Sequence, residues 1–364
     1  GSFNDGQFNY KVRNGAVWVS GPASSYKIET YRPDIIKTTF LPGQKPMDES
    51  PSYYIILEKD EELDFQVNES KNKLQLLTSD MLVEITKSPF VVNYYNKEKE
   101  PLLLASQAPV DSAGYKTLYF KAPENERYYG MGQKSIPVNR RGYAFDTRNK
   151  HIGGYSKPYA TMQVNIPYIY SSGNYGVFFD NTYTGYFDLA KTNPKEWSYR
   201  ADGGDYSYFV TTGDNLQALQ NVYYDLTGYP TLPPKWTLGL MQSKCGYKNQ
   251  NEVYDVVAQF EKHNLPLDAI ILDAFWFGGY GEDYPQLMGN FTWYEKHFPD
   301  PAGYMAKLKK KGIKTLTINE PQINTHSENH EFLVEKGWLM EIDGEPYIQN
   351  SFWAGSASLL DLTN

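Results

Sequence analysis

The stretch Ala269–Gly279 reads AIILDAFWFGG, and it decides how we interpret the C-terminal part of the chain. An apolar run that suits a buried strand leads directly into the carboxylate of Asp273 and then into the rings of Phe275, Trp276 and Phe277. A carboxylate at the end of an internal strand costs several kcal/mol unless a partner or water reaches it. We therefore expect Asp273 to belong to a site rather than to the core.

The segments around this stretch alternate between strand and helix patterns. The runs WTLGLMQS, LDAIILDAF and IKTLTINEP predict strands, and NEVYDVVAQFEKHN, PAGYMAKLKKKG and SENHEFLVEKG predict helices. Such alternation favours right-handed βαβ units and a parallel sheet. Polar residues end each strand, and the carboxyl ends of parallel strands carry the active site of a (β/α)8 barrel. An open doubly wound sheet uses the same end, but no glycine-rich nucleotide fingerprint follows the first strand.

The N-terminal part has a different pattern. Short apolar or alternating runs separated by turn signals predict an all-β sandwich or barrel; they include SYYIILEK, LDFQVN, KLQLLTS, MLVEIT, FVVNYYN, TLYFKA, YGVFFDN and YSYFVTT. A helix follows, with Asp214 as its expected N-cap and Gly228 as its stop. The proline-rich PTLPPKW then ends the pattern. We place the domain boundary at Pro230, which gives domains 1–230 and 231–364.

Composition excludes several classes of protein. The 364 residues carry a formal net charge of -8, which argues against a nucleic-acid partner. The single cysteine, Cys245, excludes an internal disulfide and a cysteine-based zinc site, and no histidine spacing predicts a metal. We expect no metal and no organic cofactor. No run is long and apolar enough to span a membrane. For location, we favour a secreted or periplasmic protein over a cytoplasmic one.

Several segments, taken in order, resemble glycoside hydrolase family 31. The family's N-terminal pattern is similar to YYGMGQKSIPVNRRGYAFDTRN and NIPYIYSSGNYGVFFDNTYTGYFDL. Its barrel entry and the parts that follow are similar to LTGYPTLPPKWTLGLMQSKCGYKNQNEV, LPLDAIILDAFWFGG and FTWYEKHFPDP. The resemblance implies an N-terminal β-sandwich followed by a (β/α)8 barrel, of which only the first three or four βα units are present here.

The resemblance also implies site residues. The strand-end aspartate of the family binds hydroxyls of the non-reducing-end sugar, and this role falls to Asp273. Trp276 and Phe277 would line the same pocket, and Trp353 would extend its wall. Glu320 would act on the site from behind the residues that touch sugar. In the N-terminal domain, Asn149 lies in a loop that is expected to reach toward the leaving-group sugar.

Two departures qualify this assignment. The family's nucleophilic and acid/base aspartates follow later barrel strands, and no matching motif occurs in this sequence, so we expect both beyond Asn364. A minority hypothesis makes Asp273 and Glu320 the catalytic pair, which requires carboxyl groups about 5 Å apart in a retaining enzyme. The second departure is Cys245, which stands where the family commonly has tryptophan. Its small side chain either widens the site or leaves space that neighbouring rings fill.

The function that this resemblance implies is a retaining α-glycosidase that acts on maltooligosaccharides or related α-glucans by double displacement. An oligosaccharide 4-α-glucosyltransferase and an α-xylosidase of the same family remain alternatives, since water and sugar acceptors use one mechanism. A non-catalytic carbohydrate-binding fragment is an alternative of another class. In each case, the expected partner is an oligosaccharide.

Overall fold

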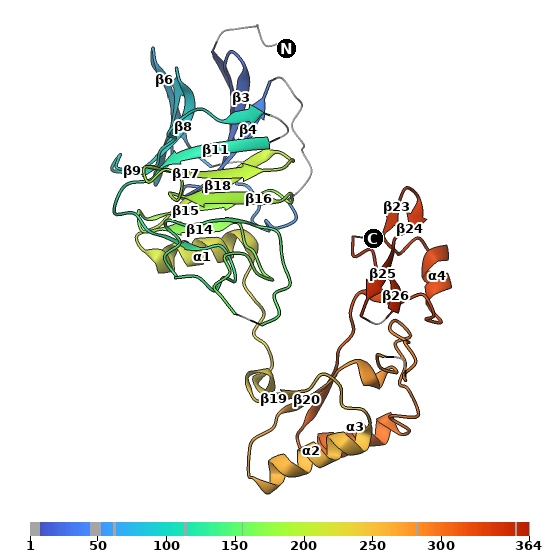
Figure 1. Ribbon diagram of the computed structural model, residues 1–364. Helices are drawn as coiled ribbons and strands as arrows, with labels where there is room; N and C mark the ends of the chain where they lie inside the picture. Colours follow the sequence, from blue (N-terminus) through green and yellow to red (C-terminus); the bar gives the residue numbers. More distant parts are fainter. Residues whose placement is uncertain are drawn as a thin grey trace. The chain divides into compact units, whose positions relative to one another are not determined.

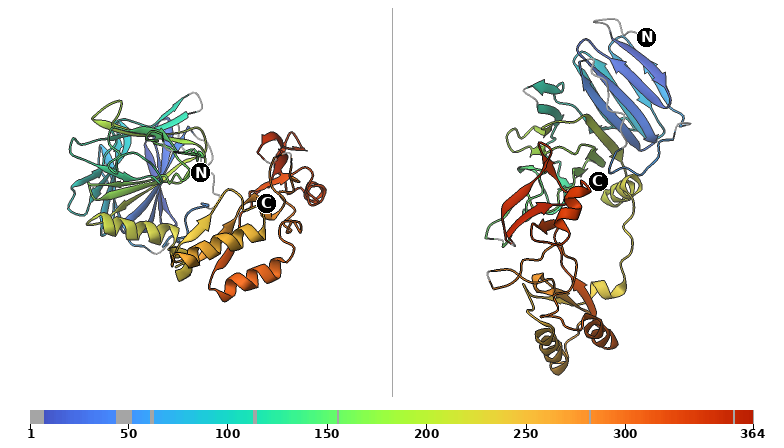
Figure 2. Two further views of the ribbon diagram at one scale, coloured as in Figure 1. Left: turned by 60° about the horizontal axis from the view of Figure 1, so that its bottom comes forward. Right: turned by 90° about the vertical axis from the view of Figure 1, so that its right-hand side faces the viewer.

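The structure of the chain is a computed structural model that describes residues 8–43, 52–60, 63–112, 115–154, 156–281, 283–353 and 355–363. The chain divides into two compact units, Gly1–Pro230 (unit 1) and Thr231–Asn364 (unit 2). Figure 1 labels their helices and strands, and Figure 2 gives two further views. Each unit is described by itself below.

Unit 1 contains an antiparallel sheet of eight strands. Their order across the sheet is β1-β2-β3-β4-β18-β15-β14-β12, so that β18 joins the N-terminal strands to the later ones. The strands are β1 (Asn9–Arg13), β2 (Ala16–Ser20), β3 (Ser24–Arg32), β4 (Ile35–Pro42), β12 (Tyr128–Gly130), β14 (Tyr168–Ser171), β15 (Tyr175–Phe179) and β18 (Tyr206–Thr212).

Two further antiparallel sheets complete the strands of unit 1. The first has the order β5-β6-β7-β8-β9, with β5 (Gln66–Glu69), β6 (Lys73–Leu77), β7 (Met81–Lys87), β8 (Phe90–Asn96) and β9 (Pro101–Leu103). The second has the order β10-β11-β17-β16-β13, with β10 (Val110–Ser112), β11 (Tyr115–Lys121), β13 (Ala144–Asp146), β16 (Gly185–Leu189) and β17 (Glu196–Ala201).

The core of unit 1 shows why these segments are strands. In β6 and β17, buried residues alternate with half-buried ones, which is the period of a strand with one face in a core. One buried cluster draws side chains from all three sheets, among them Val83 of β7, Trp197 of β17 and Val210 of β18. Trp197 stacks on Phe120 with ring centroids 4.4 Å apart. The predicted β-sandwich is therefore confirmed.

The other face of the eight-stranded sheet packs against α1 (Leu216–Thr227). A second buried cluster joins Phe178 and Phe209 of the sheet to Val222 and Leu226 of the helix. The helix ends at Gly228, as predicted from sequence, since Gly228 adopts a positive φ of 98° and its N–H reaches the carbonyl of Tyr224.

Two expectations for this region are wrong. The N-cap of α1 is Asn215, whose side chain accepts a hydrogen bond from the amide of Ala218, and not Asp214. The run SYYIILEK, predicted as a strand, lies outside every strand that the structure describes. Instead, Ile55 and Leu57 pack on the cluster around α1, and the amide of Ile56 donates to the carbonyl of Leu226. Packing against a helix end replaces strand pairing there.

Unit 2 begins with the predicted βαβαβ arrangement. A parallel sheet has the order β19-β20-β21, with β19 (Met241–Ser243), β20 (Ala269–Leu272) and β21 (Lys314–Thr317). The connecting helices are α2 (Gln250–Lys262) and α3 (Pro301–Lys310), each capped by a side chain, Asn249 or Asp300. The expected strand WTLGLMQS is only partly correct, because η1 (Lys235–Leu238), a 3₁₀-helix, precedes β19.

The rest of unit 2 is antiparallel. The order β22-β26-β25 forms one small sheet and β23-β24 a hairpin, with α4 (His330–Glu335) between β22 and β23. The strands are β22 (Gln322–Asn324), β23 (Glu341–Ile342), β24 (Glu345–Pro346), β25 (Ile348–Phe352) and β26 (Gly355–Leu359). The parallel strands thus form the start of a barrel, followed by an antiparallel addition. Within the described ranges, no helix combines the length and apolar character that a membrane crossing requires.

A buried carboxylate makes the stability of unit 1 depend on pH. Glu126 is 8% exposed and accepts hydrogen bonds from the hydroxyls of Ser171 and Tyr128. Burial raises the pKa of Glu126, although these hydrogen bonds and the charge of Arg141 oppose the rise. Between the ordinary pKa of a glutamate and this raised value, the folded state binds more protons than the unfolded state. The free energy of unfolding therefore falls as the pH rises through that window.

We predict that Glu126→Gln removes this contribution. Relative to the unmodified chain, the free energy of unfolding of the variant should increase as the pH rises above the ordinary glutamate pKa, because a neutral amide has no charge to desolvate. Urea unfolding at each pH measures the difference. The same substitution at the exposed Glu124 is the control and should give a difference that does not vary with pH. A constant difference for Glu126→Gln as well would contradict the prediction.

Candidate active site

Asp273 lies where the parallel strand β20 ends. Its side chain caps η2 (Ala274–Trp276), with Oδ1 accepting a hydrogen bond of 2.7 Å from the amide of Ala274. The residue is half-buried, and no other described residue donates to the carboxylate. One carboxylate oxygen is thus held by the backbone, and Oδ2 keeps its capacity to accept hydrogen bonds.

Trp276 and Phe277 lie in the core of unit 2. They are 6% and 2% exposed and belong to one buried cluster with residues of α2, β20 and α3. The Trp276 indole N–H donates to the carbonyl of Ile318, just after β21, at 2.8 Å. Trp276 therefore fastens the end of β20 to the end of β21. The sugar-binding role predicted for them from sequence stays a prediction.

Trp353 and Glu320 contact each other. The Trp353 indole N–H donates to Glu320 Oε1 at 3.0 Å, and the Trp353 side chain is 43% exposed. Glu320 follows β21, and Trp353 follows β25 of the antiparallel addition. The hydrogen bond joins residues 33 positions apart in the sequence. Glu320 therefore orients an accessible aromatic ring. The action on a sugar site that the resemblance implies for Glu320 stays a prediction, as does the sugar-binding role of Trp353.

Tyr280 connects Trp353 to the end of β19. Its ring meets Trp353 edge to face, with centroids 5.6 Å apart, and its hydroxyl lies 3.5 Å from Cys245 Sγ. Contact with Cys245, some burial and the negative charge of Asp273 raise the pKa of Tyr280. We call Cys245, Asp273, Tyr280, Glu320 and Trp353 the strand-end cluster. Tyr280 was missed by the sequence analysis, and its only signal was a tyrosine in the glycine-rich loop after Asp273.

The strand-end cluster offers two kinds of recognition. Its two carboxylates accept hydrogen bonds from hydroxyl groups, and such charge-assisted bonds are about twice as strong as neutral ones. Its two partly exposed aromatic rings offer apolar faces with polar edges. In the portion of the chain that the structure describes, no group of three or more acidic, histidine or cysteine side chains is arranged to hold a metal ion. The chemistry of the cluster fits a polyhydroxylated ligand.

Asn149 belongs to unit 1 and has a role within its own loop. Asn149 Oδ1 accepts hydrogen bonds from the backbone amide and from the side-chain amide of Asn165, at 3.0 and 3.1 Å. Asn165 Oδ1 in turn accepts from Lys134 Nζ at 3.0 Å. The structure therefore shows Asn149 fastening residues 149 and 165 together, and its sugar-binding role stays a prediction.

Two family models match the chain. Residues 25–188 match the glycosyl hydrolase 31 N-terminal galactose mutarotase-like domain. Residues 230–364 match the glycosyl hydrolases family 31 TIM-barrel domain. The two ranges correspond to the sandwich of unit 1 and to the parallel sheet with its antiparallel addition in unit 2. Both models describe domains of the same family, in the order in which they occur here.

Curated relatives and solved structures agree with these matches. Alpha-glucosidase 2 of Bacillus thermoamyloliquefaciens is 28% identical over 351 residues, which are 93% of this chain and 43% of the relative. An alpha-xylosidase of Emericella nidulans is 30% identical over 254 residues, which are 69% of this chain and 31% of the relative. The chain thus spans less than half the length of these relatives.

Among solved structures, a GH31 dextranase of Flavobacterium johnsoniae complexed with isomaltotriose superposes with a TM-score of 0.90 at 24% sequence identity. The match covers 98% of this chain and 44% of the dextranase. At this identity, the superposition establishes the fold. It confirms a sandwich followed by the first part of a barrel.

We predict that the chemical shift of the Trp353 indole proton depends on the hydrogen bond to Glu320. Glu320→Ala should shift the Trp353 indole proton resonance upfield, because the hydrogen bond is lost, whereas Glu320→Gln should largely keep it, because the amide oxygen still accepts. Since both side chains are partly exposed, the stability change should stay within about 1 kcal/mol. Nitrogen-labelled tryptophan spectra measure the shift, and Trp353→Phe assigns the resonance among the seven tryptophans. Equal shifts in both Glu320 variants would count against this hydrogen bond.

Lys134, which donates to the Asn165 side chain beside Asn149, makes the stability of unit 1 depend on pH. Burial lowers the pKa of Lys134 to about 7, a shift to which Arg140 adds and which Asp146 opposes. Between this value and the ordinary lysine pKa of about 10.5, the unfolded state binds more protons, so the free energy of unfolding rises with pH.

We therefore predict that the chain gains stability relative to Lys134→Met between pH 6 and pH 9, by roughly 1–3 kcal/mol. Chemical unfolding at several pH values measures this difference. Lys157→Met, at an exposed lysine between β13 and β14, is the control and should show no such trend. A Lys134→Met variant whose stability parallels that of the unmodified chain at every pH would refute the assignment.

Proposed function

Because this chain belongs to glycoside hydrolase family 31, we propose that it supplies the subsite for the non-reducing-end sugar of a retaining α-glycosidase. The proposed substrates are maltooligosaccharides or related α-glucans. The observation that carries the proposal is Asp273, a half-buried carboxylate at the end of a parallel strand with one oxygen held by the backbone and the other not engaged by a described residue.

The proposed role of Asp273 follows from its geometry. The hydrogen bond from the Ala274 amide fixes the carboxylate, so that Oδ2 is presented in one orientation. A sugar hydroxyl that donates to this oxygen forms a charge-assisted hydrogen bond, which is worth about 1.5–3 kcal/mol. A sugar that lacks the hydroxyl leaves the carboxylate without its partner. Asp273 thus converts the identity of the sugar into binding free energy.

Trp353 and Tyr280 supply the proposed apolar wall. Their rings meet edge to face at 5.6 Å, and Glu320 holds the Trp353 indole. Sugar rings present apolar C–H faces that pack on aromatic surfaces of this kind. We assign the double displacement itself to two carboxylates C-terminal to Asn364. One forms the glycosyl–enzyme bond as the leaving group departs, and the other donates a proton to the leaving oxygen and later activates water.

An α-xylosidase of the same family is the second candidate. The observation that supports it is the similarity to the alpha-xylosidase of Emericella nidulans, which is 30% identical over 254 residues. The two activities differ by one hydroxymethyl group on the substrate, so the ratio of kcat/KM for aryl α-glucoside and aryl α-xyloside separates them. A ratio above one supports the glucosidase, and a ratio below one supports the xylosidase.

Removal of the Asp273 carboxylate tests the proposed subsite. In the natural polypeptide, Asp273→Ala should lower kcat/KM for an aryl α-glucoside by about 10–150-fold, as expected for the loss of the charge-assisted hydrogen bond to Oδ2. Asp273→Asn, a matched isostere, should retain part of the activity. Substrates deoxygenated at one hydroxyl at a time identify the partner, because the deoxy substrate should lose nothing further in the Asp273→Ala variant.

A glucose-configured cyclitol epoxide esterifies the nucleophile of a retaining glycosidase. Labelling with it distinguishes Asp273 as a substrate anchor from Asp273 or Glu320 as the nucleophile and from a non-catalytic protein. An adduct on a residue after Asn364 supports Asp273 as a substrate anchor. An adduct on Asp273 or Glu320 would make one of them the nucleophile and overturn that role. Sugar binding without any adduct or turnover would instead support a non-catalytic carbohydrate-binding protein.

A further inference from the structure

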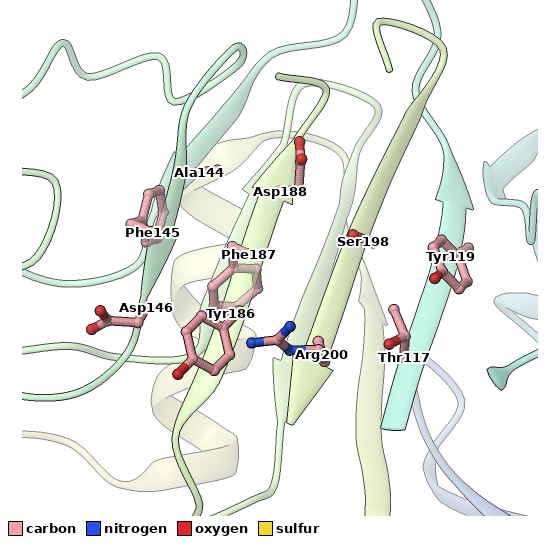
Figure 3. Close-up of a pocket in the computed structure, with 10 residues that line it drawn as sticks. All are labelled: Thr117, Tyr119, Ala144, Phe145, Asp146, Tyr186, Phe187, Asp188, Ser198 and Arg200. Carbon is pink, nitrogen blue, oxygen red and sulfur yellow. The ribbon is translucent and has the colours of Figure 1, made fainter. Parts of the chain in front are cut away.

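The outward face of the sheet β10-β11-β17-β16-β13 presents a regular array of polar and aromatic side chains. The strand registers place Tyr119 opposite Ser198 and Ser198 opposite Asp188, and the neighbouring row places Arg200 opposite Tyr186. Figure 3 shows Tyr186 and Tyr119 on opposite sides of Arg200 and Ser198. Because residues two apart share one face of a strand, both rows point the same way.

This face is hollowed. A pocket of about 450 Å³ lies over β11, β13, β16 and β17, a volume within the range of about 300–1,000 Å³ that is typical of small-molecule sites. Ser198 and Ala144 are small, whereas Tyr119, Tyr186 and Arg200 are large, so the large side chains stand around a low floor. Tyr119 and Tyr186 stand on the two strands that flank β17, which are about 9–10 Å apart across the sheet.

The charged groups of this face already have partners. Asp146 pairs with Lys150 at 2.6 Å, and Asp188 accepts hydrogen bonds from the hydroxyl and the amide of Thr192. The Arg200 guanidinium lies between two tyrosine rings, 4.1 Å from the centroid of Tyr186 and 4.5 Å from that of Tyr115. Asp146 thus has a cationic partner, and Asp188 and Arg200 carry opposite charges, so the face offers no excess charge to an ionic ligand.

The groups of the pocket that can bind a ligand are hydroxyls, the Arg200 guanidinium and the faces of tyrosine rings. Thr117, Tyr119 and Ser198 bring hydroxyl groups to the pocket, and the guanidinium of Arg200 also lines it. Hydroxyls both donate and accept, the guanidinium donates, and tyrosine rings offer apolar faces. A ligand that matches all three is neutral, carries many hydroxyls and has apolar ring faces.

From this geometry we propose that the pocket is an accessory binding site for a neutral oligosaccharide, formed by residues of the sandwich and by none of the strand-end cluster. The inference goes beyond the proposed function, since every residue of the pocket belongs to unit 1 and every residue of the cluster to unit 2. A second sugar site on the same polypeptide holds a glucan chain near the protein between encounters with the first.

Calorimetric titration of the chain with maltotriose, and separately with isomaltotriose, tests the proposal. The titrations use the Asp273→Ala variant, so that binding at the strand-end cluster is removed. We expect at least one of the two trisaccharides to bind this variant. Tyr186→Ala, added to it, should weaken binding by about tenfold, because one aromatic platform is lost. Ser198→Trp, which fills the floor of the pocket and removes no ring, should abolish binding.

Tyr95→Ala is the matched control. Tyr95 is likewise a half-buried tyrosine of unit 1 but lies on β8 in another sheet, so binding should not change. Thermal unfolding of each variant verifies that it folds. Since Ser198→Trp adds an outward side chain, it keeps the test decisive even if Tyr186→Ala does not fold.

Two outcomes would overturn the accessory site. The first is that neither trisaccharide binds once Asp273 is removed, as expected if another part of the natural polypeptide covers this face or if the strand-end cluster is the sole sugar site. The second is binding that neither Tyr186→Ala nor Ser198→Trp affects. The proposed function is judged separately: binding lost on removal of Asp273 alone supports the cluster while it refutes the accessory site.

Discussion

The parallel hydrogen bonding of β20 to both of its neighbours is the constraint on which the strand-end cluster depends. Ser243 is paired with Ile271, and Leu272 is paired with Thr317, so the three strands end at the same edge of the sheet. The residues that follow them in the chain, Cys245, Asp273 and Glu320, therefore emerge close to one another. Cys245 and Glu320, 75 positions apart in the sequence, emerge at the same edge because the crossover helices return the chain to the same side each time.

Much of unit 2 could be predicted from its sequence because the relevant signals are local. The apolar run before Asp273 and the amphipathic periods of α2 and α3 identify the βαβαβ order without knowledge of distant contacts. The environment of each side chain depends instead on long-range packing. Sequence alone did not separate the buried Trp276 from the accessible Trp353, because the burial of each ring depends on segments that are distant in the chain.

The same distinction explains the successes and errors in unit 1. Alternation in runs such as β17 identified the sandwich, because burial of one face imposes that period. It did not reveal the pocket over Ser198, because the pocket depends on which residues of β11, β16 and β17 stand opposite one another. The helix cap moved from Asp214 to Asn215 for a related reason: either side chain suits the role, and the backbone path decides between them.

The antiparallel addition that carries Trp353 has a consequence for how this molecule can diverge. Trp353 follows β25, whose partner is β26, and neither strand pairs with β19, β20 or β21. The addition is joined to the strand-end cluster by the indole hydrogen bond to Glu320 and by the ring of Tyr280. Insertions, deletions or exchanges in this hairpin can therefore accumulate while the parallel strands and Asp273 stay in register. The aromatic ring of Trp353 can thus change its position or its identity without a change in the backbone that holds the Asp273 carboxylate.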